Sequence, residues 1–149
     1  MYGRYKFKFY LNASHAIYLD GVLGEIHPHT WEITLDTVKG RNDFVQFDTI
    51  EKEIERFLGR FQDGVINEIK PFDVTNPTLE NLTVYFKREL MLILSDNGWL
   101  LTRIEVAETP ARSYIIEIDE ELDEDAAPHD KSGGDVEAAA EKKLALIFR

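Results

Sequence analysis

Two stretches of regular period-2 alternation carry three of the four histidines of this 149-residue chain. In residues 5–15 the odd positions hold Tyr, Phe, Phe, Leu, Ala and finally His15, and in residues 27–35 they hold His27, His29, Trp, Ile and Leu. Because a β-strand sends alternate side chains to opposite faces, all three imidazoles belong to the apolar faces of two strands. If these strands pair, the imidazoles meet at one end of a core.

Three neutral imidazoles with a fourth position free are the ligand set of an open zinc site. The pattern therefore predicts His15, His27 and His29 as ligands of Zn²⁺. The alternative is that the three rings hydrogen-bond one another at a subunit boundary.

Composition narrows the class of protein. The length suits one domain, and 44% hydrophobic residues indicate a globular chain. No apolar run approaches the ~20 residues of a membrane helix, and the N-terminus lacks the apolar segment of a secretory signal. We therefore expect a cytoplasmic protein without a membrane partner. The absence of cysteine excludes disulfides, thiolate metal sites and a cysteine nucleophile.

The net charge of −11 argues against nucleic acid as a partner, because binding a polyanion relies on clustered Lys and Arg. Residues 117–149 hold 11 acidic and 4 basic side chains, so most of the charge lies near the C-terminus. We expect a folded domain over residues 1–118 and an acidic tail over 119–149. Such a charge run is typical of a solvated, mobile segment.

The periodicities predict six elements. Strands are expected at about 4–14 and 28–38. Apolar residues at spacings of three and four predict helices at 49–60 and from Leu79 to about Asp96. Two further strands, Trp99–Glu108 and Ala111–Ile118, form a hairpin. The order ββααββ predicts an α+β domain with a four-stranded antiparallel sheet and two helices on one face.

Four motifs, in this order, resemble those of the 6-pyruvoyl-tetrahydropterin synthase and 6-carboxytetrahydropterin synthase family. The resemblance covers about residues 4–116. It rests on Phe9-x-x-x-Ala13-Ser14-His15, on His27-Pro28-His29, on Asn76-Pro77-Thr78-Leu79-Glu80-Asn81-Leu82, and on Glu108-Thr109.

The resemblance implies a tunnelling fold, in which ββααββ subunits form a ring whose sheets make a barrel, and two rings usually stack into a hexamer. It implies a homo-oligomer, trimer or hexamer, that binds zinc through His15, His27 and His29. The substrate of the family is 7,8-dihydroneopterin triphosphate, a dihydropterin. By position, Glu108 would be the carboxylate that anchors the pterin ring.

The acid–base residues of the family are replaced in this chain. A cysteine usually lies a few residues before the His-x-His pair, but Glu25 is the only titratable side chain in that segment here. The usual Asp-His pair aligns with Gln62-Asp63. Glu25 and Asp63 could serve as two carboxylates for proton transfer if their environments push their pKa values apart. Alternatively, Glu25 faces water in a loop and Asp63 belongs to a turn with Gly64.

Glu108 shares the parity of Ile104 and Val106, so it lies on what we expect to be the buried side of its strand. A buried carboxylate must be paired or hydrogen-bonded. The guanidine-like edge of a pterin offers it two parallel N–H donors, as an arginine does. The alternative is a carboxylate that caps the backbone of the Thr109-Pro110 turn.

Two functions from different classes follow. The first is a zinc-dependent lyase of the pterin family with altered acid–base residues. The second is a catalytically reduced relative that retains metal, ring assembly and pterin binding, and uses its acidic tail as a contact element. Glu25 separates them. If its carboxylate points at the metal-bound ligand, catalysis is still possible; if it faces solvent, the binding function is favoured.

Overall fold

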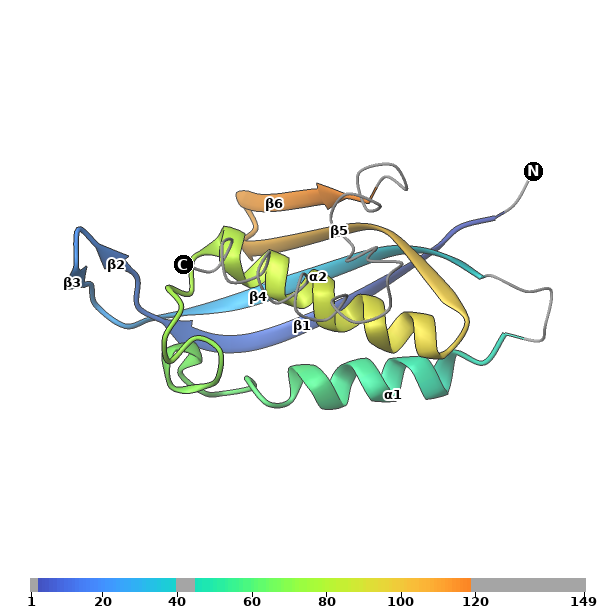
Figure 1. Cartoon of the computed structure of the whole chain (residues 1–149), viewed down its shortest axis with the longest axis horizontal. Helices are drawn as coiled ribbons and strands as arrows, with labels where there is room; N and C mark the ends of the chain where they lie inside the picture. The colour runs from blue at the N-terminus through green and yellow to red at the C-terminus, as the bar shows by residue number, and fades with distance from the viewer. Residues whose placement is uncertain (1–2, 40–44, 119–149) are drawn as a thin grey trace, which may run out of the picture.

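A single four-stranded antiparallel sheet organises the computed structural model, which describes residues 3–39 and 45–118 (Figure 1). Its strand order is β1-β4-β5-β6, so β1 and β6 form the two edges. The strands are β1 (Tyr5–His15), β4 (His27–Lys39), β5 (Trp99–Thr109) and β6 (Arg112–Glu117). Each lies within about two residues of its expected range. The expected ββααββ order and the α+β class are confirmed.

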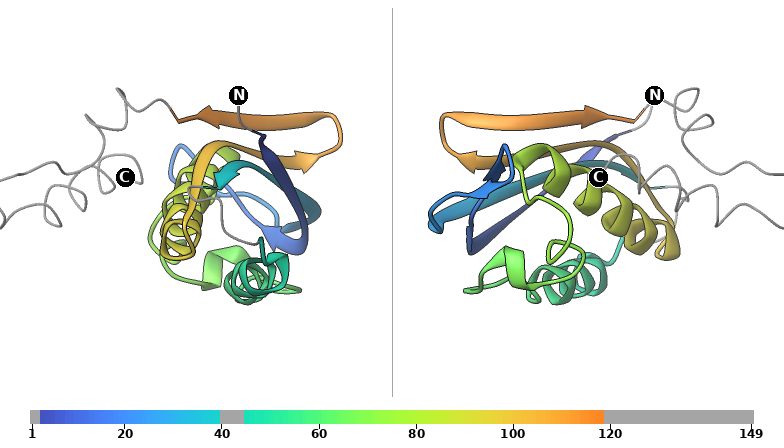
Figure 2. Two further views of the ribbon diagram at one scale, coloured as in Figure 1. Left: turned by 90° about the vertical axis from the view of Figure 1, so that its right-hand side faces the viewer. Right: turned by 60° about the vertical axis from the view of Figure 1, so that its left-hand side comes forward.

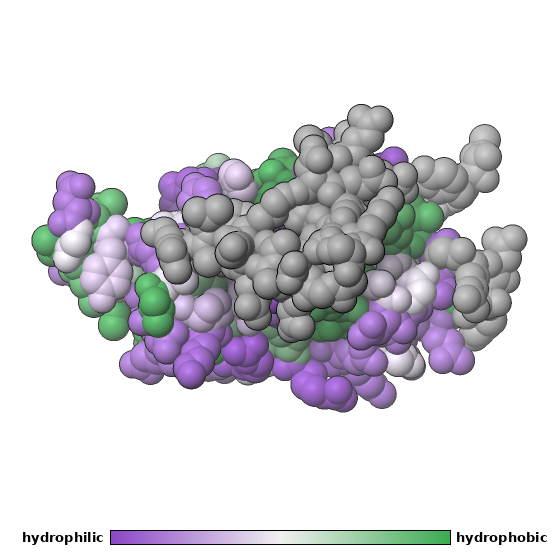
Figure 3. Space-filling view, in the orientation of Figure 1, coloured by the Kyte–Doolittle hydropathy of each residue, from purple (hydrophilic) through white to green (hydrophobic). Residues whose placement is uncertain are grey.

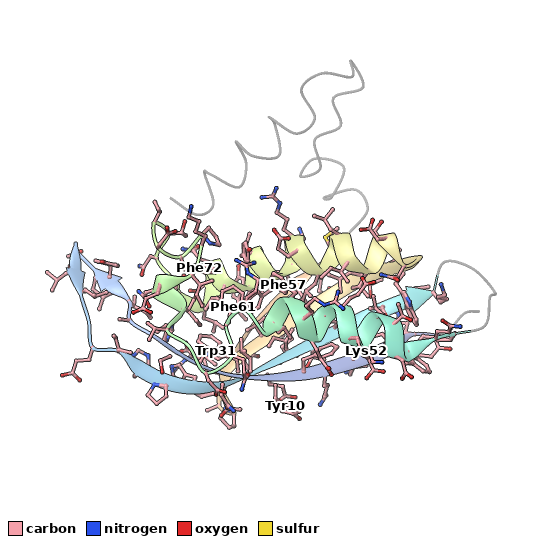
Figure 4. The ribbon with its side chains drawn as sticks, turned by 90° about the horizontal axis from the view of Figure 1, so that it is seen from below. Tyr10, Trp31, Lys52, Phe57, Phe61 and Phe72 are labelled. Carbon is pink, nitrogen blue, oxygen red and sulfur yellow. The ribbon has the colours of Figure 1, made fainter. Side chains whose placement is uncertain are left out.

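Two helices cover one face of the sheet, which curves over them (Figure 2). They are α1 (Phe47–Leu58) and α2 (Leu79–Asp96), and a short 3-10 turn, η1 (Ile66–Glu68), lies between them. Trp31 of β4 and the aromatic rings Phe57, Phe61 and Phe72 fill the space between the two layers, whereas Tyr10 projects from the opposite face of the sheet (Figure 4). The period-2 alternation in the sequence therefore separates the side chains that face the core from those on the open face of the sheet.

Local signals in the sequence set the ends of α2. The side chain of Thr78 accepts a hydrogen bond from the backbone N–H of Asn81, which makes it the N-cap. At the other end Gly98 adopts a φ of +78°, a conformation that favours glycine. Helix α1 ends at Leu58, two residues earlier than expected, because Arg60 and Phe61 continue in tighter i→i+3 hydrogen bonds that turn Phe61 into the core.

The loop between β1 and β4 contains a hairpin that the periodicity does not predict. Its strands, β2 (Tyr18–Leu19) and β3 (Val22–Leu23), have two residues each. Asp20 and Gly21 both have positive φ at the turn, as a tight two-residue hairpin requires. The hairpin projects from one end of the sheet and exposes apolar side chains there (Figure 3).

Among residues 3–39 and 45–118, no helix is long and apolar enough to cross a membrane. The acidic tail expected over residues 119–149 lies outside the described residues.

Candidate metal centre

The pairing of β1 with β4 brings the three predicted histidines together. His15 pairs with His27, and Ala13 pairs with His29, at the end of the sheet nearest the β2–β3 hairpin. The ring centroids lie 4.5 to 5.0 Å apart, and one nitrogen from each ring lies within 4.8 Å of the other two. The three side chains expected to be metal ligands therefore form one cluster.

His15 is fully buried, and its tautomer is determined by the backbone. Its Nδ1 lies 2.8 Å from the carbonyl oxygen of Pro77, which can only accept a hydrogen bond. The proton is therefore on Nδ1, and Nε2 carries a free lone pair. Pro77 is held in place in turn, because the side-chain amide of Asn81 donates to the carbonyl of Asn76 at 2.9 Å.

His27 is oriented in the same way. Its Nδ1 donates to the carbonyl oxygen of Glu25 at 3.0 Å, which leaves its Nε2 free as well. Ligating histidines in proteins almost always donate their second ring N–H to a carbonyl, carboxylate or water. Both rings therefore have the outer hydrogen bond that metal ligands have.

The charge state of the cluster also suits a cation. Burial lowers the pKa of His15 below 6.5, and repulsion from His27 and His29 acts in the same direction. Burial lowers the pKa of His29 as well, and the charges of His27 and Arg112 contribute further. Both shifts favour the neutral forms of His15 and His29, and metal ligation requires the neutral imidazole.

Among residues 3–39 and 45–118, two buried nitrogens in the cluster have no hydrogen-bond partner. They are Nε2 of His15 and Nε2 of His29, and a polar atom left in this state costs free energy. A zinc ion coordinated by three neutral imidazoles would satisfy both atoms. The residues present fit the metal, and mutual hydrogen bonding of the three rings does not account for these atoms.

Glu108 borders the cluster, as its parity predicts. Its side chain is 10% exposed, and its Oε2 lies 3.8 Å from Nε2 of His15 and 4.0 Å from Nε2 of His29. Its Oε1 accepts a hydrogen bond from Nε of Arg112 at 2.8 Å and forms an ion pair with Nη2 of the same guanidinium at 2.6 Å. The carboxylate is therefore paired by a side chain that the sequence patterns did not single out.

Asp63 lies beside the cluster. It lines a hollow of about 490 Å³ together with Pro28 and His29. It adopts a φ of +59°, and its backbone N–H donates to the carbonyl of Asn12 at 2.6 Å. Its exposed carboxylate accepts a hydrogen bond from Gln62.

Glu25 contributes its backbone to the cluster. Its carbonyl orients His27, while its side chain is exposed in the isolated subunit. Within the described ranges, no hydrogen bond or ion pair to its carboxylate is present. The structure thus brings together His15, His27, His29 and Glu108, and leaves the carboxylate of Glu25 in solvent.

Two asparagines also support the site through their side-chain amides. The amide of Asn67 accepts from the N–H of Ala16 and donates to its carbonyl, at 2.9 and 2.8 Å. The amide of Asn76 makes the same pair of bonds with Tyr18, at 2.9 and 3.0 Å. Together they fix the chain that leaves His15. Of the two, only Asn76 belongs to a motif named in the sequence, and that motif did not predict this contact.

Comparisons with known proteins place these features in a family. The family model described as 6-pyruvoyl tetrahydropterin synthase matches residues 4–119. No curated protein matches the chain significantly.

Several solved structures resemble this chain in fold. The 6-pyruvoyl tetrahydropterin synthase of Caenorhabditis elegans has a TM-score of 0.66 and 14% identity, over 78% of this chain and 96% of that one. The Plasmodium falciparum synthase has a TM-score of 0.56 and 15% identity, over 77% and 98%. An uncharacterized protein from Wolinella succinogenes has a TM-score of 0.63 and 11% identity, over 80% and 99%. These likenesses confirm the tunnelling fold of the subunit.

Proposed function

The chain belongs to the 6-pyruvoyl tetrahydropterin synthase family, and we propose that it is a zinc-dependent lyase acting on 7,8-dihydroneopterin triphosphate or a related dihydropterin. The proposal depends chiefly on one observation. Three imidazoles converge at the end of the sheet, and two of their buried Nε2 atoms have no partner among the described residues. We further propose that the enzyme works in the cytoplasm and that residues 1–118 form the catalytic unit.

The three histidines hold the metal in this proposal. The carbonyls of Pro77 and Glu25 keep His15 and His27 in the tautomer that presents Nε2. When bound, zinc would supply a positive charge that favours loss of a proton from a substrate hydroxyl.

Glu108 is the proposed substrate-binding carboxylate. It is buried beside the imidazoles, and together with His29 it lines a second hollow of about 410 Å³. A carboxylate in such a place binds a planar pair of N–H donors with both energy and orientation. The amino-pyrimidinone edge of a pterin supplies that pair, and this would fix the C6 side chain of the substrate relative to the cluster.

Asp63 and Glu25 are the proposed proton carriers. Asp63 shares a hollow with His29, so a substrate seated there would contact both residues. Glu25 lies two residues before His27 and its side chain is exposed, so in this proposal its carboxylate turns toward the substrate when the substrate binds. Two carboxylates on different sides of a substrate can act as acid and base when their pKa values differ.

We also propose that copies of the chain assemble into a trimer or hexamer. Within the part of the chain that the structure describes, β1 and β6 are the outer strands of the sheet. Exposed edges favour pairing with another strand. Residues 63–65 already pair with the last part of β1, so residues 5–11 remain for a neighbouring β6. Light scattering coupled to size exclusion would show three or six subunits, and a monomer at micromolar concentration would contradict assembly.

The decisive experiment incubates zinc-loaded protein with 7,8-dihydroneopterin triphosphate. We expect release of triphosphate and formation of a new pterin product, and chromatography measures both. No turnover by zinc-loaded protein would contradict the lyase. Retention of the unchanged pterin in that case would support the binding protein that the missing cysteine and histidine suggest.

A further inference from the structure

A β-bulge brings Glu108 and Arg112 together. In the β5–β6 hairpin Ala107 pairs with Ser113 and Thr109 pairs with Arg112, so Glu108 is the extra residue between these pairs. Bulges redirect a side chain, and they are frequent beside active sites. Here Glu108 faces the imidazoles, as its parity predicts, and the bulge sets the register in which Arg112, at the first position of β6, reaches its carboxylate.

Arg112 occupies one oxygen of this carboxylate with two donors. Its Nε and Nη2 lie 2.8 and 2.6 Å from Oε1 of Glu108. The other oxygen, Oε2, faces His15 and His29. A guanidinium and the amino-pyrimidinone edge of a pterin present the same planar pair of N–H donors. A ring edge that uses both oxygens of Glu108 must therefore take Oε1 from Arg112.

We propose that Arg112 is a specificity-determining residue, which occupies Glu108 in the ligand-free protein and competes with the guanidine-like edge of the dihydropterin. This inference rests on the proposed function, because it assumes that Glu108 binds the ring. The exposures of the two side chains indicate which one moves. Arg112 is 61% exposed and Glu108 10% exposed, so the guanidinium can swing into solvent while the carboxylate stays. Ring systems without a parallel donor pair cannot replace it.

The test measures the affinity of neopterin, a pterin without phosphates, for the zinc-loaded full chain. We expect Arg112→Ala to bind neopterin roughly 3- to 10-fold more tightly than wild type, because an exposed charge-assisted pair is removed from Glu108. Arg112→Lys should fall in between, since an ammonium lacks the planar fork. Arg103→Ala is the matched control. Arg103 also lies on this sheet but pairs with Asp36 and Glu105, so its loss should leave the affinity unchanged.

A double-mutant cycle separates competition from simple charge effects. In a Glu108→Gln background, Arg112→Ala should no longer change the affinity, because the shared carboxylate is gone. Thermal unfolding of each variant checks that the fold is retained.

Weaker binding by Arg112→Ala would make Arg112 a ligand contact and overturn the inference, as would an unchanged affinity. If wild type turns over 7,8-dihydroneopterin triphosphate and either result is found, only this inference fails. If no variant binds neopterin and wild type has no turnover, the proposed function fails and this inference with it.

Discussion

The carbonyl oxygen of Pro77 accepts the Nδ1–H of His15 at 2.8 Å, so a residue just before α2 determines which nitrogen of a strand histidine is free. Sheet and helix layers therefore meet at the candidate metal centre. The contact is buried, so the hydrogen bond is protected from competition by water. Substitutions in either layer should therefore change the affinity of the site for zinc.

Replacing His27 should remove zinc with little loss of fold. His27 is only partly buried, and its ring bonds to the backbone of Glu25. We expect wild type to hold about one zinc per chain, as an open three-histidine site does, and His27→Ala well below half of that. Metal analysis after gel filtration measures this. His129→Ala, at the fourth histidine of the chain, is the control and should keep its zinc; an equal zinc content in both variants would contradict the assignment.

Asn81 should affect zinc through His15, although it touches no ligand. Its amide donates to the carbonyl of Asn76 at 2.9 Å and so holds the turn that presents Pro77. Loss of an outer hydrogen bond of this kind costs about 10-fold or more in metal affinity, so Asn81→Ala should bind zinc at least that much more weakly.

The control for Asn81 is Asn97→Ala. It removes two amide hydrogen bonds at the opposite end of α2, to Glu53 and Ile93. Competition with a chelator of known affinity measures both variants. A similar loss of zinc affinity in the two would assign the effect to general destabilisation of α2.

Much of this site follows from spacing alone. The period-2 alternation places His15, His27 and His29 on the core face, and the register of β1 with β4 then brings them together. The position of Glu108 on the buried face of β5 is predicted by its parity with Ile104 and Val106. These residues are predictable because a strand has one periodicity and the sheet has one buried side.

The rest depends on contacts between segments far apart in sequence. Pro77 meets His15 across 62 residues, and Asn67 meets Ala16 across 51. Arg112 is close in sequence to Glu108, but the bulge that joins them depends on hairpin geometry that period-2 counting does not contain. The same limit applies to Glu25, whose backbone contributes to the site while its side chain lies in solvent.

Lowering the pH should reduce the stability of the metal-free protein. Over the same pH range it should release zinc from the zinc-loaded protein. Burial holds the pKa of His15 and His29 below 6.5 in the folded chain, whereas they titrate normally when unfolded. Below about pH 6.5 the unfolded chain binds more protons, so the free energy of unfolding falls until the pH passes the folded pKa values. Protons also compete with zinc for the neutral nitrogens.

Urea unfolding of metal-free protein between pH 7.5 and 5.5 tests the pH dependence. His29→Gln should show a shallower decrease than wild type, because it removes one of the two titrating groups. Constant stability of wild type across this range would contradict the prediction.

Asp63 should matter to turnover and not to zinc. Its carboxylate lines the hollow beside His29, while its backbone makes the bond to Asn12. Asn tolerates the positive φ at this position, so Asp63→Asn keeps the turn and removes the proton carrier. We expect roughly a 10²-fold lower kcat with unchanged zinc content. Asp73→Asn, on an exposed loop, is the control, and equal activity of both variants would exclude Asp63 from proton transfer.

Glu25→Gln separates the two roles of this residue. The carbonyl that accepts the Nδ1–H of His27 belongs to the backbone and is retained, so zinc content should not change. The side chain loses its proton-carrying group, so kcat should fall about 10²-fold if the carboxylate swings to the substrate. Full activity in Glu25→Gln would leave Asp63 as the single proposed carboxylate in proton transfer.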